Sequence, residues 1–183
     1  MRGLAALIVV VACVALGRDA GAFDPAHLTL VDQRGTMFTL ASLRGHPTVI
    51  TFVATRCTDA CPVSNAVFSQ LSSRLEREHV AATLLTITLD PEYDTPFVMS
   101  QAAKEFSAHA PRWRFASGKP SDVHAFMGAF GVIAQRGREG FPDVHSSVIY
   151  ILDARGAFSR ATLLSTNSGD EIDSYLKQRR ATR

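Results

Sequence analysis

The sequence predicts an α/β fold in which helices flank a central mixed sheet. Strand-like and helix-like segments alternate through the middle of the chain, an order typical of βαβ units with parallel strands. Hairpin patterns near both ends add antiparallel strands to that sheet. The 183 residues are 46% hydrophobic and 20% charged, which fits one globular domain with an adequate core. No repeat, low-complexity tract or interdomain linker divides the sequence.

The first 22 residues have the pattern of a secretory signal peptide. A basic Arg2 precedes an apolar run over residues 4–16, and the small residues Ala20 and Ala22 follow it. The run is shorter than the ~20 residues that a membrane-spanning helix requires. We therefore expect cleavage near Ala22, a protein exported to the bacterial periplasm, and one domain over residues 23–183.

An alternative for this leader is lipid attachment at Cys13, which follows Val10, Val11 and Ala12. That attachment would leave a very short leader, with further apolar residues after the cysteine. We expect membrane contact only through a partner protein or through such a lipid anchor. Without the leader the domain is close to neutral and has no basic run, so the sequence gives no case for nucleic acid binding.

The first half of the domain predicts a hairpin followed by a strand–helix–strand unit. Residues 28–31 and 37–40 flank the turn Asp32-Gln33-Arg34-Gly35, which is a hairpin signal. Residues 48–53 and 83–89 are apolar runs typical of buried strands. Between these strands, apolar residues recur at helical spacing. They are Val63, Val67, Phe68, Leu71 and Leu75.

The second half predicts three more helices and a second hairpin. Residues 95–108 and 121–130 have helical patterns, and residues 168–180 form a closing helix. Strands over residues 147–152 and 157–164 surround the turn Asp153-Ala154-Arg155-Gly156.

Cys57 and Cys61 are the only cysteines that remain after cleavage of the leader. A disulfide between them would close a very short loop and would remove little entropy from the unfolded chain. A redox or metal-binding role is therefore favoured over a structural one. Pro62 is well tolerated in a first helical turn, so we expect the helix to begin near Cys61 or Pro62, with Cys57 in the preceding loop.

This position has chemical consequences for the two thiols. A helix start supplies partial positive charge and free N–H groups, which favour the thiolate. A cysteine in the preceding loop also lets the pair change between bonded and open forms. Two adjacent thiolates suit Cu(I) and equally suit disulfide exchange. The spacing of the cysteines does not choose between these two chemistries.

Four segments in order resemble the SCO/SenC family of copper-binding proteins. They are residues 52–62 (FVATRCTDACP), 88–96 (TLDPEYDTP), 113–115 (WRF) and 145–153 (HSSVIYILD). The resemblance extends over roughly residues 28–180. It implies a thioredoxin-like sandwich, with a central mixed sheet, flanking helices and an N-terminal hairpin. It also implies a role in the assembly of cytochrome c oxidase.

The resemblance implies copper ligands at Cys57, Cys61 and His145. Two thiolates and an imidazole hold Cu(I) in a three-coordinate site, and an added oxygen or nitrogen ligand would complete a Cu(II) site. The implied partner is the copper-accepting subunit of cytochrome c oxidase, with other copper chaperones or thiol reductants as further partners. By spacing alone His145 would not stand out. We expect it to begin a sheet strand adjacent to the cysteine loop.

The sequence departs from the family pattern at two positions near these ligands. Thr58 stands where proline is common, and Val144 precedes His145 where aspartate is usual, so copper affinity or redox poise is expected to differ. Asp59 either tunes the thiols or takes part in partner recognition, or it caps the helix. Asp90, Pro91 and Asp94 are interpreted as a turn and a helix start, with no catalytic role.

Two functions of different classes follow from these residues. The first is a metallochaperone that delivers copper to the copper centre of cytochrome c oxidase. The second is a thiol–disulfide oxidoreductase acting on an exported partner, with Cys57 and Cys61 as its redox-active dithiol. His145 distinguishes them, since copper delivery requires it and dithiol exchange tolerates its loss. A structural zinc site would normally need four protein ligands, whereas the mature chain has only two cysteines, so we do not expect zinc.

Overall fold

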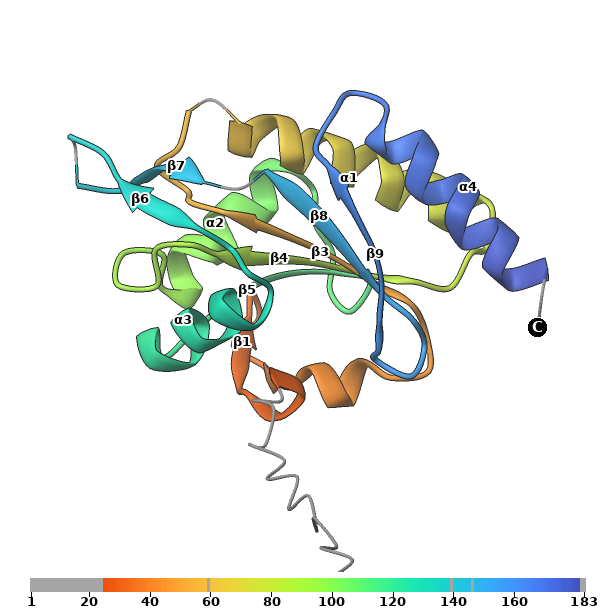
Figure 1. The fold of residues 1–183 in the computed structure, drawn as a ribbon, viewed down its shortest axis with the longest axis horizontal. Helices are drawn as coiled ribbons and strands as arrows, with labels where there is room; N and C mark the ends of the chain where they lie inside the picture. Colours follow the sequence, from red (N-terminus) through yellow and green to blue (C-terminus); the bar gives the residue numbers. More distant parts are fainter. Residues whose placement is uncertain (1–24, 59, 139, 146, 182–183) are drawn as a thin grey trace, which may run out of the picture.

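The computed structural model describes residues 25–58, 60–138, 140–145 and 147–181 (Figure 1). Its main sheet has seven strands in the order β2-β1-β5-β4-β3-β8-β9. These strands are β1 Leu30–Asp32, β2 Met37–Phe38, β3 Thr48–Val53, β4 Thr83–Thr88, β5 Trp113–Gly118, β8 Val148–Leu152 and β9 Phe158–Leu163. The β3–β4 and β4–β5 pairs are parallel and the other pairs are antiparallel, so the sheet is mixed, as the sequence predicts.

Within the described ranges of the chain, four α-helices cover the two faces of this sheet. They are α1 Ala60–Arg77, α2 Pro96–Glu105, α3 Pro120–Ala129 and α4 Ser168–Ala181. One buried cluster contains apolar side chains of α1, α2 and α4, and a second contains side chains of α3 and of the short 3-10 helix Leu40–Leu43. A second 3-10 helix spans Pro25–His27. This layering is the expected α/β sandwich.

Each helix and strand predicted from the sequence is present, and the described residues form three further strands. The sequence does not predict β5, in which the partly buried Arg114 lies between the buried Trp113 and Phe115. The other two, β6 Ala134–Arg136 and β7 Pro142–His145, form a separate two-stranded sheet. Both are too short and too polar to give a periodic apolar signal.

The strand–helix unit that carries the cysteines lies in the interior of the main sheet. All six residues of β3 are buried, because the strand has neighbours on both sides and helices over both faces. The α1 helix begins at Ala60, close to the predicted start, and Cys57 lies in the loop before it. The carboxyl ends of β3 and β4 are adjacent, since Val53 pairs with Thr88. The loop that follows β4 therefore lies beside the cysteine loop.

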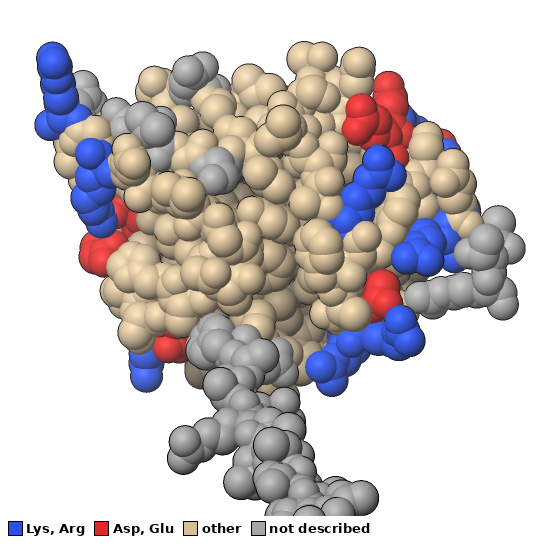
Figure 2. Space-filling model, in the orientation of Figure 1, with Lys and Arg blue, Asp and Glu red and all other residues tan. Residues whose placement is uncertain are grey.

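Charged side chains are spread over the surface of the domain. On the face drawn in Figure 2, acidic and basic side chains are interspersed around a largely uncharged centre. In the described part of the chain, no helix has the length and apolar character needed to span a membrane. The predicted leader, residues 1–22 with Cys13, and the residue Asp59 lie outside the described residues.

Candidate metal centre

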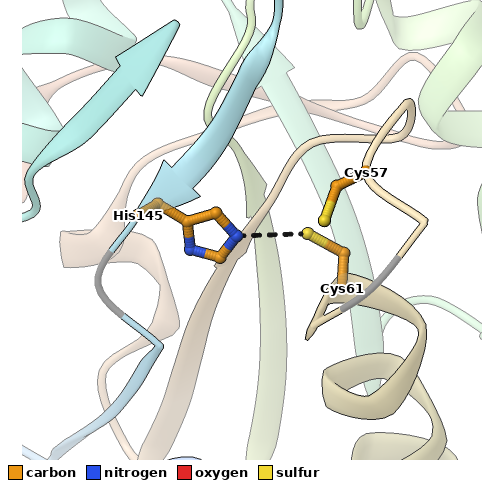
Figure 3. Close-up of side chains that lie close together, drawn as sticks. All are labelled: Cys57, Cys61 and His145. Atoms are coloured by element: carbon orange, nitrogen blue, oxygen red, sulfur yellow. Dashed lines mark hydrogen bonds between the residues drawn. The ribbon is translucent and has the colours of Figure 1, made fainter. Parts of the chain in front are cut away.

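Three side chains from separate parts of the fold converge at one point (Figure 3). Cys57 comes from the loop after β3, Cys61 from the first turn of α1, and His145 from the last position of β7. The Sγ atom of Cys61 lies 3.4 Å from Nε2 of His145, although 84 positions separate them in the sequence. The two sulfur atoms and the nearest ring nitrogen all lie within 4.8 Å of one another.

The position of His145 differs from the expectation in one respect. The sequence predicts that this histidine begins a strand of the main sheet, whereas it ends β7, and the sheet strand β8 begins only at Val148. The reason is that β7 pairs with β6, with Ala134 opposite His145, rather than with the main sheet. The histidine nevertheless lies beside the cysteine loop, as the sequence predicts.

Local contacts fix the two cysteines against the sheet. Both thiols are free and buried, with 7% of Cys57 and 3% of Cys61 exposed. The backbone N–H of Ala54 donates a hydrogen bond to Sγ of Cys61 over 3.4 Å. One turn into α1, the buried hydroxyls of Ser64 and Thr51 lie 2.8 Å apart and join the helix to β3. The start of α1 is therefore held at a fixed distance from the sheet.

Burial is the largest influence on the ionisation of Cys61 among its described surroundings. Removal from water raises the pKa of the Cys61 thiol far above its usual range, and the nearby Cys57 raises it further. The hydrogen bond from Ala54 lowers the pKa but does not compensate. Burial therefore opposes the thiolate that the helix start is expected to favour. A bound cation would supply the charge that a buried thiolate needs.

A second set of contacts, which the sequence does not reveal, holds the cysteine loop against the loop that follows β4. The buried carboxylate of Asp94 accepts hydrogen bonds from the backbone N–H of Thr55 at 3.1 Å and from the hydroxyl of Thr88 at 2.7 Å. The Thr55 hydroxyl also donates to it. Burial raises the pKa of Asp94, although these donors favour its charged form. The sequence around Asp94 indicates only a turn and a helix start.

The arrangement has the donor atoms and the spacing of a soft-metal site. Ligand bonds of about 2.0–2.3 Å, the range known for zinc with nitrogen and sulfur, place neighbouring ligand atoms roughly 3.4–4.0 Å apart. Sγ of Cys61 and Nε2 of His145, which lie at the hydrogen-bond distance of 3.4 Å, are at the short end of this range. All three donor atoms lie within 4.8 Å of one another, so a small closure would let them share one ion. Two sulfurs and one imidazole favour Cu(I) over hard cations, which prefer oxygen.

The family model described as SCO1/SenC matches residues 20–179. The chain belongs to the SCO1/SenC family. The SCO2-like protein of Rickettsia felis is 30% identical over 153 residues, which cover 81% of this chain and 73% of that relative. The structure of Bradyrhizobium japonicum ScoI with copper bound is 30% identical, with a TM-score of 0.71 over 82% of this chain and 96% of that one.

A third comparison connects the family with an assembly process. The structure of BsSco is described as showing a disulfide switch in a member of the Sco family of cytochrome c oxidase assembly proteins. It is 25% identical, with a TM-score of 0.70 over 82% of this chain and 89% of that one. These neighbours confirm the thioredoxin-like fold of the SCO1/SenC domain. Of the two departures from the family pattern, Thr58 is exposed, and the side chain of Val144 lies outside the described part.

Proposed function

We propose that this SCO1/SenC protein binds copper through Cys57, Cys61 and His145 and delivers it to the copper-accepting subunit of cytochrome c oxidase. The observation that carries the proposal is the convergence of two thiols and an imidazole within 4.8 Å. The histidine comes from a hairpin far along the chain, and a dithiol that only exchanged disulfides would not need it. The copper-bound ScoI relative and the oxidase-assembly description of BsSco support the cargo and the process.

The site chemistry suits transfer as well as binding. Cu(I) requires only three soft ligands, and each thiol loses its proton to solvent as its sulfur binds the metal. His145 is only half-buried, so an acceptor ligand can approach on its side and replace the imidazole first. An added oxygen or nitrogen ligand would accommodate Cu(II). Copper is the cargo in this reaction and leaves with the acceptor.

The proposed location of the domain is the bacterial periplasm. The pattern of residues 1–22 supports cleavage near Ala22 and a periplasmic domain over residues 23–183, with lipid attachment at Cys13 as the alternative. In an oxidising compartment the dithiol needs reduction before it binds Cu(I). Other copper chaperones and thiol reductants are therefore expected partners beside the oxidase subunit.

The second candidate function is thiol–disulfide exchange, which the free, adjacent thiols favour. Cys57 and Cys61 would form one disulfide, and the partner's disulfide would take up two electrons and two protons to become a dithiol. The disulfide switch described for BsSco supports this chemistry in a relative.

A paired reconstitution separates the two functions. Reduced, copper-loaded protein is mixed with an apo copper-accepting oxidase domain, and copper transfer is followed beside reduction of that domain's own disulfide. We expect copper transfer by the parent protein and strongly reduced transfer by His145→Ala. Unchanged disulfide exchange by His145→Ala, together with no copper retained by the parent, would favour the oxidoreductase and overturn the proposal.

A further inference from the structure

A buried carboxylate near the metal site lies between two arginines. Asp90 follows the end of β4 and is 1% exposed. Its Oδ2 accepts a hydrogen bond from Nη2 of Arg56 at 2.6 Å, and its Oδ1 lies 3.0 Å from Nη2 of Arg136. A buried carboxylate is stable when its charge is balanced in this way. The sequence around Asp90 indicates only a turn.

The two arginines belong to the two segments that carry the metal ligands. Arg56 immediately precedes Cys57 in the loop after β3. Arg136 ends β6, the strand that pairs with β7, and two positions before it Ala134 lies opposite His145. The hairpin of β6 and β7 belongs to a different sheet from β3. Asp90 therefore connects the cysteine loop with the histidine hairpin through charged contacts.

Further contacts of the two arginines strengthen this connection. The guanidinium of Arg56 lies over the ring of Tyr93 at 4.1 Å and over that of Phe141, in the hairpin, at 5.3 Å. Arg136 donates from Nη1 to the carbonyl oxygen of Gly140 at 2.8 Å and pairs with Glu92 at 3.2 Å. Both side chains are thus held on two sides, and both guanidinium groups lie at ion-pair distance from the Asp90 carboxylate.

The charge of Asp90 is what holds the cysteine loop and the β6–β7 hairpin together. Two guanidinium groups that share one carboxylate would repel each other without its negative charge, and burial of that carboxylate limits screening by solvent. Glu92 offsets part of the charge on Arg136 only, and its side chain is about half exposed. Removal of the Asp90 charge is therefore expected to move the hairpin away from the cysteine loop.

We propose that Asp90 is a positioning residue of the metal site: by pairing with Arg56 and Arg136, it sets the distance between His145 and the two cysteine sulfurs. Asp90 is not among the three proposed ligands. Its effect on copper affinity passes through the imidazole, and this part of the inference rests on the proposed copper function. Its effect on the hairpin does not depend on copper.

The experiment compares Asp90→Asn with a matched control. Asp32 on β1 is also fully buried and pairs with Arg114 at 2.6 Å, but β1 is separated from β4 by β5. Asp32→Asn therefore removes a similar buried charge away from the metal site. Arg136→Gln is a second test variant, because its half-exposed side chain can be changed with little risk to folding. Each variant is made with His145 present and with His145→Ala.

Two measurements are made on each reduced protein. The first is amide hydrogen exchange of residues 134–145 without metal, and the second is Cu(I) affinity by competition with a chelator. We expect Asp90→Asn and Arg136→Gln to speed exchange in the hairpin at least tenfold, and Asp32→Asn to leave it unchanged. We also expect His145→Ala to weaken copper binding about 10- to 100-fold in the parent protein and less than threefold in Asp90→Asn.

The possible results separate the inference from the copper function. Unchanged hairpin exchange in both test variants would overturn the positioning role, as would an equal loss of protection in Asp32→Asn. A full effect of His145→Ala on copper affinity in the Asp90→Asn protein would overturn it as well. Faster hairpin exchange in a protein that binds no copper would support the connection between the segments and refute the proposed function alone.

Discussion

Cys61 lies between two opposing influences, a helix start that favours its thiolate and a buried environment that favours its thiol. The raised pKa shows that burial dominates while no cation is bound. The chemistry of the site therefore depends on what replaces the thiol proton. A soft cation balances the thiolate charge that the buried environment disfavours.

The first prediction, at this scale, concerns pH. Because the thiol proton of Cys61 competes with the metal, Cu(I) affinity is expected to rise with pH through the neutral range, about tenfold per pH unit for each proton released. The sign follows from the raised pKa, since the thiol is protonated throughout that range. Chelator competition at pH 6, 7 and 8 measures the slope. A flat profile would show that Cys61 binds no metal or is already ionised.

At the scale of the elements, the site depends on how loops after parallel strands meet. The ends of β3 and β4 lie side by side, and Asp94 from the second loop accepts hydrogen bonds from Thr55 in the first. The buried hydroxyl of Thr88 uses the same carboxylate. These contacts give the cysteine loop a defined conformation before any metal binds.

The second prediction tests those contacts. Asp94→Ala leaves the buried Thr88 hydroxyl and the Thr55 N–H without their acceptor, and is expected to lower the free energy of unfolding by about 1–3 kcal/mol. Asp94→Asn keeps one acceptor oxygen and should lose less. Urea unfolding of the reduced proteins measures both values. Equal losses in the two variants would show that the carboxylate charge, which both variants lose, accounts for the effect rather than the acceptor oxygen that Asn keeps.

The elements also show what the sequence reveals and what it does not. The apolar runs of β3 and β4 and the helical spacing from Val63 to Leu75 identify the unit that carries the cysteines, because burial on both faces leaves a long signal. The β6–β7 hairpin gives no such signal, since it is short and polar. The family resemblance therefore predicts correctly that His145 lies beside the cysteine loop, but it assigns the residue to the wrong strand.

The same limit applies to the acidic residues after β4. Asp90 and Asp94 occur in a segment whose pattern indicates a turn and a helix start, and Thr95 does cap α2 by accepting from the backbone N–H of Val98. Their burial depends on arginine and threonine partners at distant positions in the sequence. Residue spacing carries no information on those partners, so only the structure reveals this second role.

At the scale of the whole molecule, the metal joins three segments that the fold only brings near one another. A ligand that binds the folded chain and not the unfolded one stabilises the fold by mass action. The loop after β3, the start of α1 and the end of β7 would then share one ion. Copper binding is expected to be coupled to the stability of the domain.

The third prediction follows from this coupling. With free Cu(I) buffered at 100 times its dissociation constant, the expected stabilisation is about 2.7 kcal/mol, which for a domain of this size raises Tm by roughly 5–11 °C. Thermal unfolding of the reduced protein, with and without buffered copper, measures the change. An equal rise in the Cys57→Ser protein would place the stabilising copper elsewhere in the molecule.

The central claim is that Cys57, Cys61 and His145 form one copper site, and the most direct test is the copper stoichiometry of the reduced protein. We predict one Cu(I) per chain in the parent protein and no tight binding in Cys57→Ser or Cys61→Ser, because each loses a soft ligand. His145→Ala should still bind one ion, held by the two thiolates, with strongly reduced affinity. Parent protein without copper, or a cysteine variant that keeps full stoichiometry and affinity, would contradict the account.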